Sequence, residues 1–462
     1  MKLGQFLSLR YNFLSIDYLN EFLEISNQTP EEPFSNIQDV FVKETGKTVG
    51  EFFSEFNAKP VAIGTISQVY FARLKDGSPV AAKIQRPNIK ELFETDFSLI
   101  YFFAPVLDFF RLLSSVQAVA VATEFINWTK NELDFTYEAK NAAALYEHSK
   151  KHPQTIIPKQ YLEITTPRIL IQEFIYRGVL AEDILLNKIK KEELAGKNID
   201  LGELTNYLIK NHLRQYFIDG FFHFNPHPAN LIFLPENKLA YLDFGIVGPA
   251  GGGDKEDRLL LLKSFYGLAK NNVDFLSENL FEFNQKALDE KVDFFLQGNL
   301  IKRQATKKII EKIKELIFVD FKKDIEEIIT DKNFPLILKK IGEVAEKYGA
   351  VLPREIIIFF CVLSFLDTIA LRLYPAFDII NALNGFFEEY PLEKAERLIK
   401  EGLHKKEAGE KIIPLMNLDW EFFKEVSALE KEKREVVKEK MTEMIFYYAE
   451  KYEEVKSLLE TI

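Results

Sequence analysis

The sequence predicts an α+β protein that is predominantly helical, and two observations carry this prediction. Residues 69–84 contain two runs rich in β-branched and aromatic residues, joined by a turn at Asp76 and Gly77, which is the pattern of a β-hairpin. Apolar residues recur at helical spacing before this hairpin and over most of the chain after residue 201. A small sheet among many helices is therefore expected.

The elements follow in order along the chain. Helices are expected up to about residue 58, before the hairpin. Pro87 ends the second strand, and helical spacing then continues to about His148. The apolar run from Ile169 predicts another strand, and residues 231–243 predict two short strands within the helical C-terminal part.

These patterns divide the chain into four expected segments. They are a helical N-terminal extension over residues 1–60, a lobe with the sheet and a helical insertion over 61–175, a helical lobe over 176–426, and a charged helix over 427–462. A chain of 462 residues is long enough for two or three lobes or domains.

The composition narrows the class of function. A net charge of -11 argues against a nucleic-acid binder, because such proteins usually carry excess Lys and Arg. Cys361 is the only cysteine, so neither an intramolecular disulfide nor a cysteine-based zinc site is expected. A reducing compartment fits this composition, and the cytoplasm is the expected location, with peripheral contact to the inner face of the membrane as an alternative.

Two apolar segments are candidates for membrane spans. Residues 97–122 and 356–373 are both interrupted by charged residues, and neither offers the roughly 20 apolar residues that a span needs. Both are expected to be buried helices. The aromatic cluster Tyr101-Phe102-Phe103 with Phe109-Phe110 also suits contact with lipid or a lipid-like ligand, and this alternative stays open.

Three separated elements fit one phosphate-binding site. The first is Lys83, at the end of the predicted strand Val80-Ala-Ala-Lys, where a lysine reaches nucleotide phosphates. The second is the group Glu132, Asp134 and Glu138 on a predicted helix, which offers a carboxylate to pair with Lys83. Alone, each is more often a solvated lysine or a solvated helix face.

The third and most specific element runs from His223 to Gly245. The loop His223-Phe-Asn-Pro-His-Pro-Ala-Asn230 precedes two strands and the turn Asp243-Phe-Gly, which is the layout of a kinase catalytic loop. Asn230 and Asp243 offer the oxygen ligands that Mg²⁺ prefers. His223 and His227 stand four residues apart, but the intervening Pro226 argues against a helical metal-binding pair, so structural roles are expected.

With these elements assembled, the sequence resembles the UbiB family of atypical protein-kinase-like proteins, also called the ADCK group, over residues 1 to roughly 385. The most distinctive mark is the Lys-x-Gly-Gln motif, here Lys2-Leu-Gly-Gln5. A second mark is the loop that starts at Ala62 and corresponds to the family's alanine-rich loop.

The resemblance implies roles for individual residues. Lys83 matches the phosphate-aligning lysine, and Glu138 matches the helix glutamate that pairs with it. Asn230 and Asp243 match the two Mg²⁺ ligands, and Glu173 falls in the hinge that meets the adenine. Further contacts with the nucleotide are implied for Ala62, Gly64 and Thr65, and a latch across the pocket for Lys2, Gln5, Glu132 and Asp134.

The same resemblance implies the fold and the chemistry. The fold is a bilobal protein-kinase-like domain with a helical N-terminal extension that obstructs access of a protein substrate. The cofactors are ATP and Mg²⁺, and the activity is ATP hydrolysis rather than protein phosphorylation. The implied context is isoprenoid-lipid or quinone biosynthesis at membranes, with a nucleotide, an isoprenoid lipid or quinone precursor, and biosynthetic proteins as partners.

Asn225 is the most consequential departure from the family pattern, because it occupies the position of the catalytic aspartate. An amide cannot accept a proton from an attacking hydroxyl or water, so general-base assistance of about 10²–10⁴-fold is lost. Phosphoryl transfer depends mainly on positioning and charge, so binding of MgATP should survive better than hydrolysis.

Other departures are smaller. Gly64 and Thr65 alter the alanine-rich loop, and Ala229 replaces a glycine before Asn230. The motif at Lys2 starts earlier in the chain than in relatives, and the C-terminal transmembrane tail of some relatives is not recognised here.

Three hypotheses follow. The leading one is a UbiB-like ATP-binding protein with slow or conditional ATPase activity. The second is a catalytically impaired pseudokinase that acts as a nucleotide-gated scaffold, which Asn225 favours. The third, a small-molecule kinase of the aminoglycoside or choline type, is disfavoured by Lys2-Leu-Gly-Gln5 and by Asn225.

Overall fold

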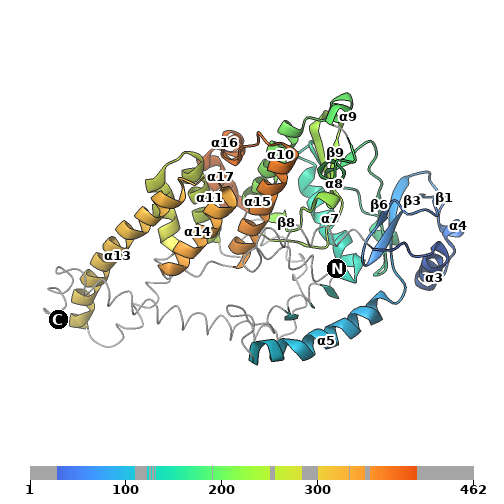
Figure 1. Ribbon diagram of the computed structural model, residues 1–462, viewed down its shortest axis with the longest axis horizontal. Coiled ribbons are helices and arrows are strands. Elements are labelled where there is room, and N and C mark those ends of the chain that lie inside the picture. The colour runs from blue at the N-terminus through green and yellow to red at the C-terminus, as the bar shows by residue number, and fades with distance from the viewer. Residues whose placement is uncertain are drawn as a thin grey trace. The chain divides into compact units, whose positions relative to one another are not determined.

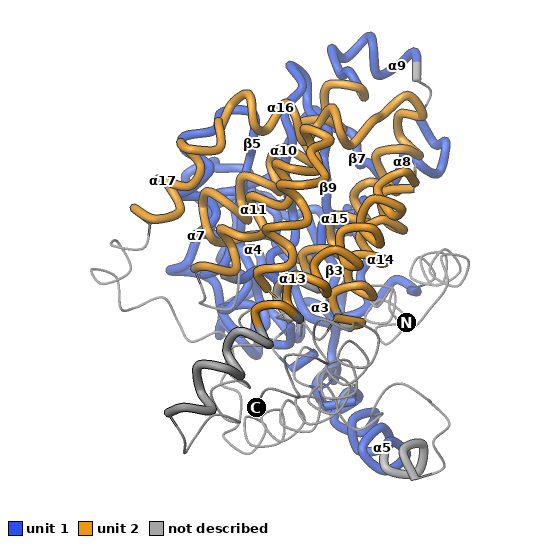
Figure 2. The backbone as a smooth tube through the Cα atoms, turned by 90° about the vertical axis from the view of Figure 1, so that its left-hand side faces the viewer, with its two compact units in different colours: residues 1–200, 225–248, 415–418 blue, residues 201–224, 249–414, 419–462 orange. Residues whose placement is uncertain are grey.

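The computed structural model describes ten stretches of the chain, which fall into two compact units (Figure 2). Unit 1 holds the described residues within 1–200 and 225–248, and unit 2 those within 201–224 and 249–414. The motif from Lys2 to Gln5 and the predicted helix 427–462 lie outside the described residues. The described residues are 29–109, 122–123, 126, 129–130, 132–189, 191–249, 255–283, 300–331, 333–348 and 354–402.

The larger sheet of unit 1 has the order β1-β3-β4-β6, with β2 also paired to β3. Its strands β1, β3 and β6 are labelled in Figure 1. Its hairpin confirms the prediction, and Gly77 in the turn has a φ of 86°, a conformation that favours glycine. Two strands were not predicted, because β1 and β2 are two residues long and too short to show alternation. The bounds are β1 Glu55–Phe56, β2 Ala62–Ile63, β3 Ser67–Arg73, β4 Pro79–Gln85 and β6 Ile169–Glu173.

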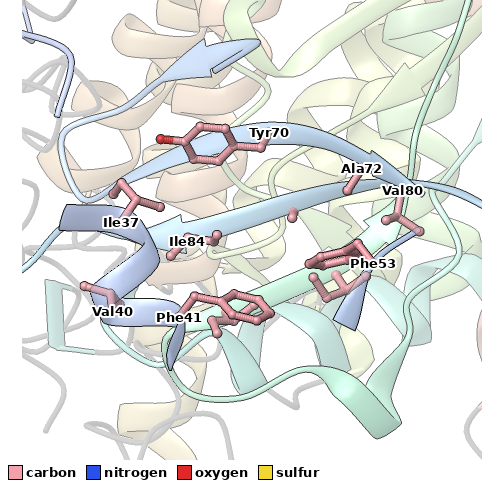
Figure 3. Packing of buried hydrophobic residues seen from close by; sticks show 11 residues of the cluster. Ile37, Val40, Phe41, Phe53, Tyr70, Ala72, Val80 and Ile84 are labelled. Atoms are coloured by element: carbon pink, nitrogen blue, oxygen red, sulfur yellow. The ribbon is translucent and has the colours of Figure 1, made fainter. Parts of the chain in front are cut away.

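One face of this sheet packs against α3 (Phe34–Thr45). Ile37, Val40 and Phe41 point from the helix toward Tyr70 and Val80 on the strands (Figure 3). The helix ends at Gly46, which has a left-handed φ of 71°, as glycine at a helix C-terminus commonly does. The short helix α4 (Val49–Phe52) follows. The predicted helices before residue 58 are therefore present within the described residues.

A second core cluster joins α5 (Ile89–Phe109) and α7 (Phe135–Ser149) to the sheet. Phe93 and Phe97 of α5 are buried in it, whereas Phe102 is 70% exposed and Phe103 is 55% exposed. Within the described part of the apolar segment 97–122, the expected burial is correct for Phe97 and wrong for Phe102 and Phe103, and residues 110–121 lie outside the described residues.

The smaller sheet of unit 1 has the order β5-β10-β9-β7. Its antiparallel pair β9 (Leu231–Leu234) and β10 (Lys238–Tyr241) confirms the predicted strand pair. Gly178, just before β7, packs so closely that a Cβ there would lie 1.9 Å from Cγ2 of Ile232. The remaining elements are β5 Thr155–Ile156, η1 Leu162–Ile164, β7 Val179–Leu180, α8 Ala181–Leu185, α9 Lys191–Gly196, η3 Pro228–Asn230, η4 Pro235–Asn237 and β11 Val247–Pro249.

Unit 2 is predominantly helical, with one short strand, β8. Its core lies around α15, which packs against α10 and α14, and Ile356, Leu363 and Leu366 of α15 are fully buried. This confirms the expectation that residues 356–373 form a buried helix. Among the described helices, none is both long enough and apolar enough to cross a bilayer. The bounds are α10 Leu201–Arg214, η2 Gln215–Asp219, β8 Phe221–His223, α11 Lys255–Ala269, α13 Leu300–Ile328, α14 Phe334–Lys347, α15 Arg354–Leu373, α16 Ile379–Glu389 and α17 Leu392–Gly402.

Candidate functional site

The centre of the candidate site is a buried ion pair between β4 and α7. Lys83 Nζ lies 2.9 Å from Oε1 and 2.8 Å from Oε2 of Glu138, and the two side chains are 18% and 6% exposed. The ammonium also lies 4.9 Å from the ring centre of Phe135, one turn before Glu138 on α7. The pairing expected from the sequence is therefore present, and it holds Lys83 in one position.

More carboxylates than ammonium groups surround this pair. Burial alone would lower the pKa of Lys83, but the carboxylates of Glu138 and Asp243 raise it above its usual value. Burial raises the pKa of Glu138, and Asp243 and Glu132 raise it further against the opposing effect of Lys83. Three carboxylates thus act electrostatically on one lysine, and this negative charge suits a bound cation.

Asp243 lies in a constrained turn after β10. Its Oδ1 accepts a hydrogen bond of 2.9 Å from the backbone N–H of Gly245, which fixes the rotation of the carboxylate. The N–H of Leu242 donates to the carbonyl of Asn230 at 3.0 Å. The two predicted Mg²⁺ ligands, Asn230 and Asp243, are therefore held on adjacent backbone segments.

The donor set fits a magnesium ion. Asn230 and Asp243 supply an amide oxygen and a carboxylate, and Mg²⁺ commonly takes one or two such protein ligands and completes its shell with phosphate oxygens and water. The described residues contain no group of three or more His, Cys, Asp or Glu side chains placed to hold a metal by themselves.

The predicted nucleotide loop lies in register with Lys83. Ala62 on β2 pairs with Val69 on β3, and Val69 pairs with Lys83 on β4, so Ala62 and Lys83 are two strands, about 10 Å, apart in one row. Ala62 and Gly64 are exposed, and Thr65 is half-buried. Ala62 and Gly64 are therefore accessible to solvent.

Arg86 holds this loop through hydrogen bonds to backbone carbonyls, a contact that the sequence did not reveal. Its Nε donates to the carbonyl of Gly64 at 3.1 Å, and its Nη2 donates to the carbonyl of Pro30 at 2.6 Å. The side chain of Arg86 is 11% exposed. The loop at Gly64 and the segment before α3 are thus held by the same guanidinium.

Glu132 and Asp134 have different surroundings, although the sequence grouped them. Asp134 is the N-cap of α7, and its Oδ1 accepts a hydrogen bond of 2.9 Å from the N–H of Thr136. The expectation that one helix carries Glu132, Asp134 and Glu138 is wrong, because α7 begins only after this cap. Glu132 lies instead near the turn of Asp243, with its Cγ 3.6 Å from the position that a Cβ on Gly245 would take.

Glu173 and Asn225 complete the predicted site residues. Glu173 ends β6 with an exposed side chain, and its N–H donates to the carbonyl of Lys159 at 2.8 Å. Asn225 belongs to unit 1, and its carbonyl accepts a hydrogen bond of 2.8 Å from the N–H of His227. His227 in turn accepts from the N–H of Ala229 through Nδ1 at 3.2 Å, a structural capping role as expected.

The comparison with protein families agrees with this geometry. The model of the ABC1 atypical kinase-like domain matches residues 24–280, which is more than half of the chain. This range includes Lys83, Glu138, Asn230 and Asp243.

Relatives in several organisms cover different shares of the chain. Uncharacterized protein slr0889 of Synechocystis is 33% identical over 54% of this chain and 61% of its own length. The chloroplastic protein ACTIVITY OF BC1 COMPLEX KINASE 8 of Arabidopsis thaliana is 28% identical over 82% of this chain and 50% of its own length. The chain therefore spans half to three fifths of these two relatives.

A further relative and a solved structure extend the likeness. A probable protein kinase UbiB of Pseudomonas fluorescens is 26% identical over 85% of this chain and 69% of its own length. The solved complex of Rv3197 with erythromycin from Mycobacterium tuberculosis superimposes with a TM-score of 0.54 at 22% identity, over 86% of this chain and 92% of that one. This structure supports the fold alone. The chain belongs to the ABC1 family of atypical kinase-like proteins, and the predicted kinase-like α+β fold is confirmed.

Proposed function

We propose that the chain binds MgATP in unit 1 and hydrolyses it slowly or under specific conditions. The observation that carries this proposal is the buried pair Lys83–Glu138 beside Asp243, with the segment of Asp243 tied to Asn230. A fixed lysine next to an excess of carboxylates suits a ligand made of phosphate and a divalent cation.

Each side chain has a defined role in the proposal. Lys83 aligns the phosphates, and Glu138 holds Lys83. Asn230 and Asp243 hold Mg²⁺, which would neutralise charge on the phosphates when bound. The row formed by Ala62 and Lys83, with Gly64 and Thr65 beyond it, supports nucleotide contacts at this loop, and the end of β6 at Glu173 supports contact with the base.

The proposed biological context is isoprenoid-lipid or quinone biosynthesis. The family resemblance and the relatives named UbiB support it. The exposed rings of Phe102 and Phe103 on α5 are compatible with peripheral contact to a membrane or a lipid-like partner. In this context a latch formed by Lys2 and Gln5 with Glu132 and Asp134 would regulate access to the nucleotide.

A second candidate function is a nucleotide-gated scaffold for a biosynthetic partner. Asn225 favours it, because the amide cannot act as the general base of phosphoryl transfer while the proposed Mg²⁺ ligands are retained. Tight nucleotide binding without turnover would distinguish the scaffold from the ATPase.

Hydrolysis of ATP by the purified protein tests the proposal. Phosphate release is measured in the absence and in the presence of anionic liposomes. We expect slow release by the wild type in at least one of these conditions, and release by Lys83→Ala no faster than background in both. Surface variant Lys150→Ala, whose ion pair with Glu147 is exposed, should match the wild type. Phosphate release that persists equally in Lys83→Ala would contradict the assignment of this site.

A further inference from the structure

The two carbonyl groups on either side of Asp243 are each bound by a side-chain amide. Asn141 on α7 donates through Nδ2 to the carbonyl of Phe244 at 3.0 Å. Gln172 on β6 donates through Nε2 to the carbonyl of Leu242, at a longer distance of 3.5 Å. The segment that carries a proposed Mg²⁺ ligand is thus held from two neighbouring elements of unit 1.

The orientation of Gln172 is set by its own neighbour. Gln160 donates through Nε2 to Oε1 of Gln172 at 3.1 Å, so the amide nitrogen of Gln172 must face Leu242. Gln172 is 6% exposed and Gln160 is 9% exposed. A buried amide with its oxygen already engaged is a directional donor, and its displacement would leave polar groups unsatisfied.

The position of Asn141 on α7 links the two halves of the site. Asn141 follows Glu138 by three residues, so both side chains lie on one face of the helix. Glu138 holds Lys83, and Asn141 holds the turn after Asp243. A shift of α7 would therefore move the phosphate-aligning lysine and the metal-binding turn together.

We propose that Asn141 is a positioning residue for the Mg²⁺ ligand Asp243, with Gln172 as a weaker second support. This inference rests on the proposed function, in which Asp243 binds the ion. Mg²⁺ demands near-ideal octahedral geometry, so a loosely held ligand binds it less well. Groups that orient metal ligands through hydrogen bonds typically contribute about 10–100-fold to metal affinity.

The test separates metal binding from nucleotide binding. In Asn141→Ala, we expect the Mg²⁺ concentration needed for half-maximal ATP binding to rise by about 10-fold. Binding of ATP in EDTA should stay unchanged, because Lys83 and Glu138 are intact. Gln172→Ala should show a smaller rise, because its hydrogen bond is longer. The control is Asn206→Ala in unit 2, since Asn206 also donates to a backbone carbonyl, that of Gly202, at 2.8 Å.

Hydrogen exchange in the ligand-free protein provides a readout that does not depend on nucleotide. In Asn141→Ala, amides of residues 242–247 should exchange faster than in the wild type and in Asn206→Ala. If Asn141→Ala does not fold, Asn141→Ser, which keeps a shorter donor, replaces it in both experiments with a smaller expected effect.

The outcomes are distinguishable. Unchanged Mg²⁺ dependence together with unchanged exchange at residues 242–247 would overturn the positioning role. Weakened ATP binding in EDTA by the same factor would also overturn it, because a general structural defect would then explain the loss. If the wild type binds no ATP under any condition, the proposed function fails, whereas faster exchange in Asn141→Ala would still show that Asn141 holds the turn.

Discussion

Replacing Asn225 with Asp is expected to raise the rate of ATP hydrolysis by about 10²-fold or more, because a positioned general base contributes about 10²–10⁴-fold. The two side chains have nearly the same size and shape, so packing should not change. The carboxylate can accept a proton from the attacking water or hydroxyl, which the amide cannot do. The measurement is phosphate release at saturating MgATP.

The double variant Lys83→Met, Asn225→Asp is the control for this experiment. The double variant should not show the increased rate of ATP hydrolysis, because without the Lys83 ammonium the phosphates are no longer aligned. MgATP affinity of Asn225→Asp should stay close to that of the wild type, since Asn225 is not among the proposed ligands. An unchanged rate with intact binding would show that position 225 does not face the attacking nucleophile.

Removing the ammonium of the buried pair should destabilise unit 1 in a pH-dependent manner. Lys83→Met leaves Glu138 buried without its counter-charge. We expect the free energy of unfolding to fall by about 1–3 kcal/mol at pH 8. This is less than the loss usual for breaking a fully buried ion pair, because the Glu138 carboxyl can take up a proton. The pKa of Glu138, already raised by burial, would rise further without Lys83. A carboxyl whose native pKa exceeds its unfolded value favours the folded state at low pH and loses this contribution as pH rises through the native pKa. The loss should therefore be small at pH 5 and largest at pH 8.

Urea unfolding of Lys83→Met at several pH values checks this expectation. The matched control is Lys150→Met, because the pair of Lys150 with Glu147 is exposed, at 53% and 64% of the two side chains. Exposed pairs contribute about 0–1 kcal/mol, so this control should change little at any pH. A loss in Lys83→Met that is the same at pH 5 and pH 8 would contradict a buried, uncompensated Glu138.

The local parts of the fold could be predicted from the sequence. The hairpin β3–β4 and the pair β9–β10 were predicted because alternation and turn residues lie within a few positions of each other. Strands β1 and β2 were not predicted, because a strand of two residues is too short to show an alternation of apolar and polar side chains. For α5, periodicity marked the apolar positions but did not show that Phe102 and Phe103 are uncovered while Phe97 is buried.

In the candidate site, too, residues within short motifs were predicted, whereas a contact between residues far apart in the chain was not. Lys83, Glu138, Asn230 and Asp243 were predicted because each lies in a short motif typical of the family. Asn141 was missed, because its partner is a backbone carbonyl 103 residues away in the chain. Its only local signal is its place three residues after Glu138 on one helix face.

The most direct test of a nucleotide site at Lys83 is calorimetric titration of MgATP into the wild-type protein and into Lys83→Met, near pH 6, where the variant should be less destabilised than at pH 8. We expect saturable binding at one site in the wild type, weaker binding in EDTA, and strongly reduced binding in the variant. Absence of binding to the wild type, or equal binding to the folded variant, would contradict a nucleotide site at Lys83, Asn230 and Asp243.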